Sequence, residues 1–149
     1  IKIQRKIKLM SKVIFREVTK DDLDSIFNIL NQLKKINIKS INKELAWKNF
    51  NENKSTKSIV GILDKKIVSY GSIVIENKIR GEVAGHIEDI VVDKNYRGRF
   101  IGDNLIKELI NIGEKYNCYR ISLFCKEHLK NFYSRQGFNK TSINMKKYL

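Results

Sequence analysis

The stretch GHIEDIVVDKNYRGRFIG, residues 85–102, determines how the whole chain is interpreted. Its apolar run predicts a strand over residues 86–93, and this strand carries two adjacent acids, Glu88 and Asp89. A basic loop with two glycines follows, and an apolar helical pattern then covers residues 102–116. The sequence thus places carboxylates on a strand next to the free backbone amides of a helix start.

The loop before this helix has the chemistry of an anion site. The first amides of a helix have no intrahelical partner and carry partial positive charge, which suits a pyrophosphate. Gly98 and Gly102 lie around the helix start, while Arg97 and Arg99 add guanidinium donors. The spacing matches neither a P-loop nor the dinucleotide fingerprint. Taken alone, the loop is equally consistent with a solvated basic turn.

The two acids and one tyrosine are candidate site residues. Adjacent residues of a strand face opposite sides of a sheet, so we expect Glu88 and Asp89 to diverge. Charged side chains in a buried strand are unfavourable unless they are paired or functional; solvated acids at a strand edge are the alternative. Tyr133, on a short helix predicted over residues 127–136, is a candidate proton donor, with a core role as the alternative.

Hydrophobic periodicity predicts the remaining elements. We expect strands at residues 13–18, 58–64, 66–76, 86–93 and 120–125, and one or two more in 137–149. We expect helices at residues 19–35, 42–50, 102–116 and 127–136. The helix between the strands at 86–93 and 120–125 is a crossover, which makes those two strands parallel. The prediction is an α/β (α+β) fold with a mixed, mostly antiparallel central sheet and flanking helices.

Length and charge limit the function classes. The chain has 149 residues, which suits one domain, and we expect that domain at 13–149 after an N-terminal extension at 1–12. The sequence has no run of 18 apolar residues, so no membrane span is expected. The net charge of +14 favours an anionic partner such as nucleic acid, a membrane surface or a phosphorylated small molecule. The lysines are spread along the chain, which argues against nucleic acid.

The cysteines and histidines predict neither a disulfide nor a metal site. If Cys118 and Cys125 both lie on the strand near 120–125, they are roughly 23 Å apart, too far for a disulfide. Two unpaired thiols and no visible secretory signal favour a cytoplasmic protein. The spacing of these cysteines with His86 and His128 does not resemble a zinc site.

Several segments together resemble the GNAT superfamily of acetyl-CoA-dependent N-acetyltransferases over about residues 13–149. They are GHIEDIVV, YRGRFIG, NCYRISLFC and NFYSRQGF. Within the superfamily, GHIEDI is similar to the glucosamine-6-phosphate N-acetyltransferase family. The resemblance implies a GNAT fold in which the strands at 86–93 and 120–125 splay apart, and a homodimer with the C-terminal strand near Met145 at the interface. It implies acetyl transfer from acetyl-CoA to D-glucosamine 6-phosphate, which yields CoA and a precursor of UDP-N-acetylglucosamine.

The resemblance also implies two sets of site residues. The implied acetyl-CoA site comprises Ile90, Val91, Val92, Arg97, Gly98, Arg99, Phe100, Ile101, Gly102, Asn131 and Tyr133. The implied sugar-phosphate site comprises Lys34, Lys78, Ile79, Arg80, Gly81, Glu88, Asp89, Tyr119 and Arg120. Tyr119 and Arg120 would act from the second subunit. Tyr133 would serve the CoA sulfur, and Glu88, directly or through water, is the candidate base, with a main-chain carbonyl as its rival.

Three positions depart from the family pattern. Phe100 occupies the central glycine position of the loop, where its amide is usable if φ is negative. Phe124 replaces the carboxylate that follows the last strand leucine, so an amine contact there must be main-chain. Leu129 replaces an asparagine at a helix start, for which Asn131 and His128 are candidate substitutes.

Two other functions remain open at this point. The first is a GNAT enzyme for another amine, either a polyamine or a protein N-terminus. The basic residues Lys34, Lys78, Arg80 and Arg120 favour an anionic acceptor instead. The second is a non-catalytic nucleic-acid-binding protein, which would bind DNA or RNA in a salt-sensitive way and release no thiol from acetyl-CoA.

Overall fold

The computed structural model describes residues 12–149, so nearly all of the expected N-terminal extension lies outside the described residues. The strands are β1 (Ile14–Glu17), β2 (Thr56–Leu63), β3 (Lys66–Asn77), β4 (Val83–Val92) and β5 (Arg120–Leu123). The α-helices are α1 (Leu23–Leu33), α2 (Lys43–Glu52), α3 (Ile101–Lys115) and α4 (Lys130–Ser134). Short 3-10 turns are η1 (Lys20–Asp22), η2 (Ile38–Ser40), η3 (Lys94–Tyr96) and η4 (Glu127–Leu129).

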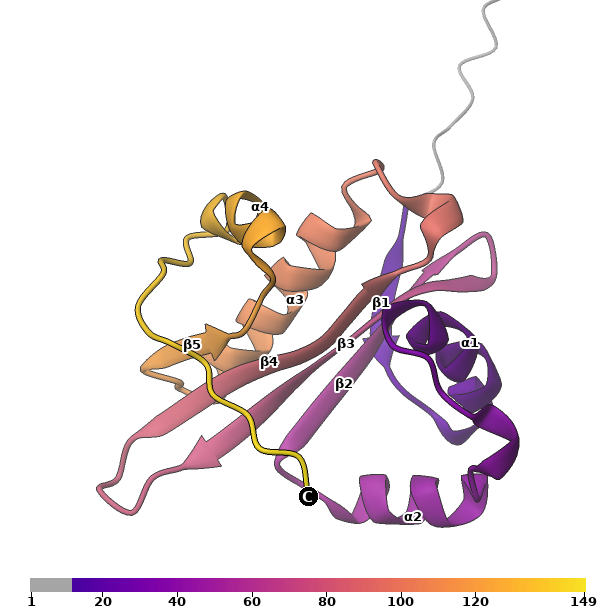
Figure 1. Cartoon of the computed structure of the whole chain (residues 1–149), viewed down its shortest axis with the longest axis horizontal. Coiled ribbons are helices and arrows are strands. Elements are labelled where there is room, and N and C mark those ends of the chain that lie inside the picture. Colours follow the sequence, from indigo (N-terminus) through magenta and orange to yellow (C-terminus); the bar gives the residue numbers. More distant parts are fainter. Residues whose placement is uncertain (1–11) are drawn as a thin grey trace, which may run out of the picture.

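The described part of the chain forms one five-stranded sheet in the order β1-β2-β3-β4-β5 (Figure 1). Neighbouring strands are antiparallel except β4 and β5, which are parallel because α3 connects them as a crossover. Asp64 and Lys65 join β2 to β3 with left-handed φ values of 48° and 65°, as a two-residue hairpin turn requires. The predicted fold class is therefore confirmed.

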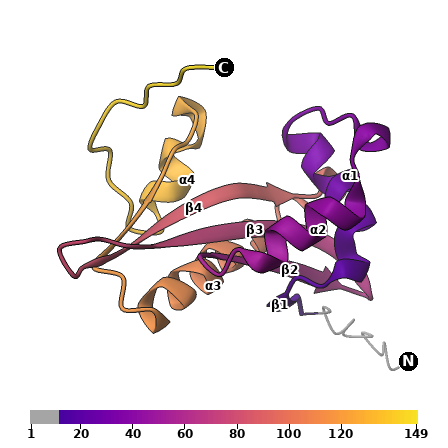
Figure 2. The same cartoon turned by 90° about the horizontal axis from the view of Figure 1, so that it is seen from below.

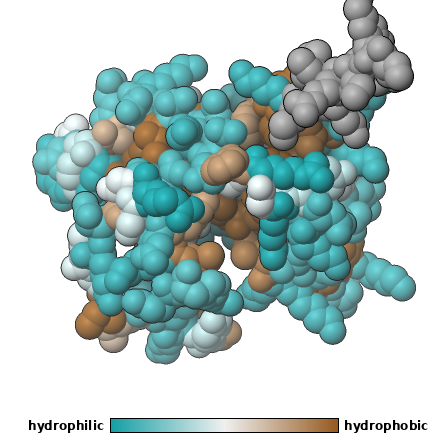
Figure 3. Space-filling model, turned by 90° about the horizontal axis from the view of Figure 1, so that it is seen from above, coloured by the Kyte–Doolittle hydropathy of each residue, from teal (hydrophilic) through white to brown (hydrophobic). Residues whose placement is uncertain are grey.

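Helices cover both faces of the sheet (Figures 1 and 2). On one face, Ile26 and Ile29 from the apolar stripe of α1 form a cluster with Val60, Tyr70 and Val91 of the sheet. On the other face, α3 contributes to a cluster formed by Ile59, Ile73, Ile75, Ile87, Leu105, Ile106, Leu109 and Tyr133. Figure 3 shows one face of the molecule, where hydrophilic side chains dominate and apolar side chains are visible in a hollow near its middle.

The parallel pair β4 and β5 remains hydrogen-bonded over only part of its length. Its register runs from Ala84 opposite Arg120 to Ile87 opposite Leu123. Strand β5 ends there, earlier than the predicted residue 125, while β4 continues to Val92. The edge of β4 over residues 88–92 is therefore left without a β5 partner, as the predicted splay requires.

A β-bulge interrupts β4 within this unpaired region. Tyr70 lies opposite Val91 and Ser72 lies opposite Glu88, so two residues of β4 face one residue of β3. Asp89 is one of the two and has a φ of 54°. The extra residue reverses the alternation of the strand: Ile87 packs in the α3 cluster and Val91 in the α1 cluster.

The strands predicted in residues 137–149 are wrong. After Gly137, which has a φ of 91°, the described chain is coil to its end. Ile143, Met145 and Leu149 are almost fully exposed. A strand is stabilised by its ladder and by the surface it packs on, and this segment has neither within the single chain. Its β-like pattern is therefore not sufficient to form a strand.

Candidate active site

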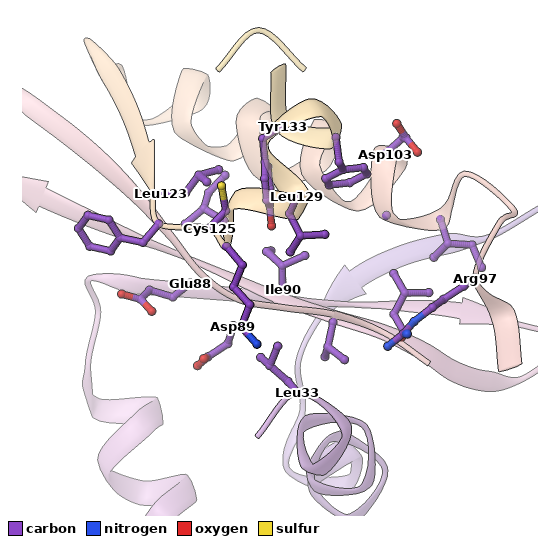
Figure 4. Close-up of a pocket in the computed structure, with 18 of the residues that line it drawn as sticks. Leu33, Glu88, Asp89, Ile90, Arg97, Asp103, Leu123, Cys125, Leu129 and Tyr133 are labelled. Atoms are coloured by element: carbon purple, nitrogen blue, oxygen red, sulfur yellow. The ribbon is translucent and has the colours of Figure 1, made fainter. Parts of the chain in front are cut away.

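A cleft of about 900 Å³ opens where β4 and β5 separate. Its walls also include the start of α3, the η4–α4 segment and the end of α1. Figure 4 shows Tyr133 and Leu129 on one side of the cleft, and Ile90 and Leu33 on the other. The predicted site residues in its lining are Glu88, Asp89, Ile90, Val91, Val92, Arg97, Gly98, Phe100, Ile101, Gly102 and Tyr133.

The end of the cleft at α3 is rich in available amides. No described side chain caps the first residues of this helix. At Gly102, a Cβ atom would lie 3.3 Å from the ring of Phe132 and 3.6 Å from Val92, so glycine keeps this wall open. Gly98 has a φ of 76°, in the left-handed region that glycine adopts readily. The geometry suits an anionic group at the helix start.

Phe100 departs from what the sequence led us to expect. Its use as an amide donor assumed a negative φ, but its φ is 58° and its ψ is 15°. The backbone therefore adopts the conformation that a glycine would provide, although the residue carries a Cβ. The ring is 75 % exposed, so its packing does little to offset the strain.

The remaining predicted cofactor residues are arranged differently. Arg97 lines the cleft, and its Nε donates to the carbonyl oxygen of Val92 at 3.4 Å. The guanidinium of Arg99 lies over the ring of Tyr96, 5.3 Å from its centroid, and Arg99 is not part of the lining. Asn131 is exposed on α4 and is also absent from the lining. Of these three residues, the structure brings only Arg97 to the cleft.

The two acids do not diverge, so that prediction is wrong. The bulge at Asp89 breaks the alternation, and Figure 4 shows the carboxylates of Glu88 and Asp89 on the same side of β4. Partial desolvation raises the pKa of Asp89, and the negative charge of Glu88 raises it further. The ammonium group of Lys34 opposes both effects. The result is an acidic corner at one end of the cleft with a lysine nearby.

His86 is a site residue that the sequence interpretation missed. Its Nε2 lies 3.1 Å from Oε1 of Glu88, and its Nδ1 lies 3.0 Å from Oγ of Ser122 on β5. The ring of Phe124 packs against the imidazole at a centroid distance of 4.9 Å. The two-residue spacing of His86 and Glu88 on one strand was the available signal, because such residues share a face.

Tyr133 combines the two roles that the sequence left open. It is 8 % exposed and belongs to the α3 cluster, where Phe132 and Phe138 pack edge-on against its ring. Its hydroxyl nevertheless points into the cleft toward Ile90 (Figure 4). Burial raises the pKa of Tyr133, and the neighbouring Cys125 raises it further. The phenol is therefore fully protonated at neutral pH and can act as a donor.

Most predicted sugar-phosphate residues lie outside the cleft. Arg120 Nε and Arg80 Nη2 both donate to the hydroxyl of Tyr119, at 2.6 and 3.0 Å. The hydrogen bond from Arg120 is the main reason that the pKa of Tyr119 is lowered. Lys78, just after the end of β3, forms an ion pair with Glu76 at 2.7 Å. We call Lys78, Arg80, Tyr119 and Arg120 the basic cluster.

The loop that joins β3 to β4 carries the other two predicted residues. Ile79 is fully exposed, and Gly81 has a φ of 91° with its amide donating to the carbonyl oxygen of Lys78. The predicted substrate and cofactor residues that do not line the cleft are Lys34, Lys78, Ile79, Arg80, Gly81, Arg99, Tyr119, Arg120 and Asn131. The predicted substrate residues therefore form two separate groups within one chain.

A comparison with protein families identifies the family to which this fold belongs. Residues 23–138, most of the chain, match the acetyltransferase (GNAT) family. The chain belongs to this family. As a GNAT acetyltransferase, it takes its acetyl group from acetyl-CoA.

Relatives of this GNAT protein share a more specific name. Glucosamine 6-phosphate N-acetyltransferase 1 of Dictyostelium discoideum is 33% identical over 145 residues, which cover 92% of this chain and 91% of the relative. Glucosamine 6-phosphate N-acetyltransferase of Arabidopsis thaliana is 39% identical over 85 residues, which cover 56% of this chain and 57% of that protein. The match to the plant protein thus spans little more than half the length of each chain.

Solved structures of acetyltransferases have a similar fold. The crystal structure of glucosamine-6-phosphate N-acetyltransferase from Arabidopsis thaliana superposes with a TM-score of 0.83 and 29% identity, covering 92% of this chain and 98% of that one. An acetyltransferase from Trypanosoma brucei gives a TM-score of 0.84 with 27% identity, covering 93% of this chain and 100% of the other.

The structure adds three facts about the described residues. Both cysteines in this part of the chain are free, although neither lies within β5 itself. Across residues 12–149, no group of three or more histidine, cysteine or acidic side chains is placed to hold a metal ion. No helix in the same range is long and apolar enough to cross a membrane.

Proposed function

We propose that the chain transfers the acetyl group of acetyl-CoA to the amine of D-glucosamine 6-phosphate. The observation that carries this proposal is the match to the Dictyostelium enzyme of that name, which extends over 92% of this chain. The product would be N-acetyl-D-glucosamine 6-phosphate, a precursor of UDP-N-acetylglucosamine. The cytoplasm is the proposed location, in keeping with two free thiols.

The cleft supports a binding mode for acetyl-CoA. The unpaired edge of β4 at Ile90, Val91 and Val92 offers backbone groups to the pantetheine arm, in place of the missing β5 ladder. The first amides of α3, together with Arg97, would hold the pyrophosphate. In this binding mode the thioester would lie near the middle of the cleft, into which the hydroxyl of Tyr133 points.

The acidic corner supports an amine acceptor. Glu88 and Asp89 would bind the amino group of the sugar and orient it toward the thioester carbonyl. In the reaction a C–N bond forms and the C–S bond breaks. The amine proton passes to Glu88, directly or through water, or to a main-chain carbonyl, and Tyr133 donates a proton to the departing thiolate. Much of the rate would come from positioning the two bound reactants.

The basic cluster supports a homodimer. Lys78, Arg80 and Arg120 have the chemistry to bind a sugar phosphate, yet they lie outside the cleft of their own chain. A two-fold axis that brings the cluster of one subunit to the cleft of the other would complete the acceptor site. The exposed apolar side chains of the C-terminal segment, among them Met145, would be buried in the same interface.

One assay tests the reaction. Acetyl-CoA is incubated with glucosamine 6-phosphate or with unphosphorylated glucosamine, and free CoA is measured with a thiol reagent. We expect kcat/KM to be at least about 10-fold higher with the phosphosugar, because the phosphate supplies charge-assisted hydrogen bonds. Equal values would remove the phosphosugar assignment. Faster CoA release with spermidine or with a peptide amine would favour another GNAT substrate.

A mixing experiment tests the shared site. Glu88→Gln disables the cleft and Arg120→Ala disables the basic cluster, so each variant alone should be nearly inactive. After unfolding and refolding together, half of the dimers are mixed, and each mixed dimer contains one intact composite site. Activity should recover to about one quarter of the wild-type value. No recovery from a mixture that sediments as dimers would contradict a site shared between subunits.

A further inference from the structure

We infer that His86 is a positioning residue for Glu88 and that Ser122 holds its imidazole in one tautomer. The inference rests on the proposed function, in which Glu88 handles the proton of the acceptor amine. It arises from a chain of three side chains that crosses from β5 to β4 at the mouth of the cleft. That chain is Ser122, His86 and Glu88.

The sheet sets the geometry of these three side chains. His86 lies directly opposite Ser122 in the parallel register, one pair before the last paired residues, Ile87 and Leu123. Glu88 is two residues beyond His86 and therefore shares its face of the sheet. The series of three side chains thus ends at Glu88, the first residue of β4 that has lost its β5 partner. Any movement of β5 relative to β4 would be transmitted to Glu88 through the imidazole.

Hydrogen-bond chemistry selects one protonation pattern. A neutral imidazole has one donor nitrogen and one acceptor nitrogen, and an ionised carboxylate only accepts. The hydroxyl of Ser122 is free to donate, so it donates to Nδ1 and leaves the proton on Nε2. Nε2 then carries its proton beside Oε1 of Glu88, which lies 3.1 Å away. Ser122 therefore fixes the tautomer that Glu88 needs.

The surroundings strengthen this role. The side chain of His86 is 25% exposed and that of Glu88 is 52% exposed, so the histidine is the more sheltered partner. The ring of Phe124 covers the imidazole from the β5 side, in the position after Leu123 where the family pattern has a carboxylate. Among the described residues, His86 is the basic side chain that lies within ion-pair distance of Glu88. Because the imidazole lies beside Oε1, the other oxygen is left for the amine.

Two matched pairs of variants test the inference. His86→Asn removes the donor at the Nε2 position, whereas His86→Gln places an amide NH₂ close to it. Ser122→Ala removes the hydroxyl, whereas Ser122→Thr keeps it. We expect kcat with glucosamine 6-phosphate to fall about 10-fold in the Asn and Ala variants and to be largely restored in the Gln and Thr variants. KM for acetyl-CoA should not change.

The pH profile separates positioning from a purely structural role. If His86 acts through Glu88, His86→Asn shifts the acidic limb of the kcat profile but causes no further loss when it is added to Glu88→Gln. Equal kcat values and unshifted profiles for the Asn and Gln variants would overturn the inference. So would additive losses in the double variant.

A spectroscopic measurement keeps the inference separate from the proposed substrate. The chain has two histidines, so the imidazole ¹⁵N signals of His86 are those absent from the His86→Asn spectrum. We expect the Nε2–H tautomer in the wild type and a mixture of tautomers in Ser122→Ala. If the wild type does not acetylate glucosamine 6-phosphate, the proposed function fails. An Nδ1–H tautomer, or no change in Ser122→Ala, overturns the inference whatever the substrate.

Discussion

The guanidinium of Arg16 binds the carboxylate of Asp22 through two hydrogen bonds, Nη1 to Oδ2 at 2.7 Å and Nη2 to Oδ1 at 2.8 Å. The backbone amide and the hydroxyl of Thr19 also donate to Oδ2. The Asp22 side chain is only 7% exposed. This pair fixes β1 to the turn that begins α1, and the hydrogen bonds from Arg16 are the main reason that the pKa of Asp22 falls to about 2.

The lowered pKa of Asp22 predicts a specific pH dependence of stability. A carboxyl group with a depressed pKa stabilises the fold above its unfolded pKa, near 3.8, and this contribution is lost as pH falls toward 2. It amounts to about 2 kcal/mol. Asp22→Asn should lower the free energy of unfolding by about that amount at pH 7 and by less at pH 3. Urea denaturation at both pH values measures it, with the exposed neighbour in Asp21→Asn as the control. A constant difference between wild type and Asp22→Asn across this range would contradict the prediction.

Tyr133→Phe separates the catalytic role of this residue from its packing role. The substitution keeps the ring contacts with Phe132 and Phe138 and removes the hydroxyl that points into the cleft. We expect kcat to fall by roughly 10²-fold, the lower range for general acid catalysis, with little change in Tm or in acetyl-CoA affinity. Tyr116→Phe, at the residue that follows the C-terminal end of α3, serves as the control. Near-wild-type kcat would leave Tyr133 with a packing role only.

Phe100→Gly should relieve backbone strain at the start of α3. A non-glycine residue in the left-handed region is destabilised by about 1–2 kcal/mol, and the exposed ring offers little compensation. After the greater chain entropy of glycine is subtracted, we expect a net gain of up to about 1 kcal/mol. KM for acetyl-CoA should fall as well, because the loop is opened to the pyrophosphate. Gly98→Ala, which introduces a Cβ at a φ of 76°, should have the opposite effect on stability. A less stable Phe100→Gly variant would show that the ring stabilises the loop.

Arg80→Ala tests the basic cluster. The lost charge should raise KM for glucosamine 6-phosphate by roughly 10-fold, which is typical of a hydrogen bond to a charged group. KM for acetyl-CoA, and activity on unphosphorylated glucosamine, should stay near their wild-type values. Lys107→Ala, at an exposed position of α3, is the charge-matched control. An equal loss with both sugars would mean that Arg80 supports the fold of the loop and does not bind phosphate.

Much of the fold was predictable because local patterns and tertiary packing agree. The apolar stripe that includes Ile26 and Ile29 is the face of α1 that packs on the sheet. The crossover rule alone gave the parallel pairing of β4 with β5. The C-terminal segment was not predictable in this way, because the alternation around Ile143 and Met145 describes a strand only when another strand is available to pair with it.

The candidate site was predictable as a set of residues but not as a geometry. The loop glycines and Tyr133 line one cleft, as the family resemblance implied. The conformation of Asp89 was hidden, because an acid in an apolar run gives no sign of a positive φ. His86 was missed because its contact with Ser122 depends on the register of two strands that are distant in sequence. Register is a property of the whole sheet.

The bulge in β4 acts on the strand as a shift of phase. Upstream of it, Ile87 fills the core beneath α3; downstream, Val91 fills the core beneath α1. Deleting Asp89 would restore a continuous two-residue period and turn Ile90, Val91 and Val92 toward the wrong helices. The two hydrophobic layers therefore require a residue at this position even though its side chain belongs to neither of them. Pressure to keep the core intact would preserve the spacing of the acidic corner in a lineage that no longer needed its chemistry.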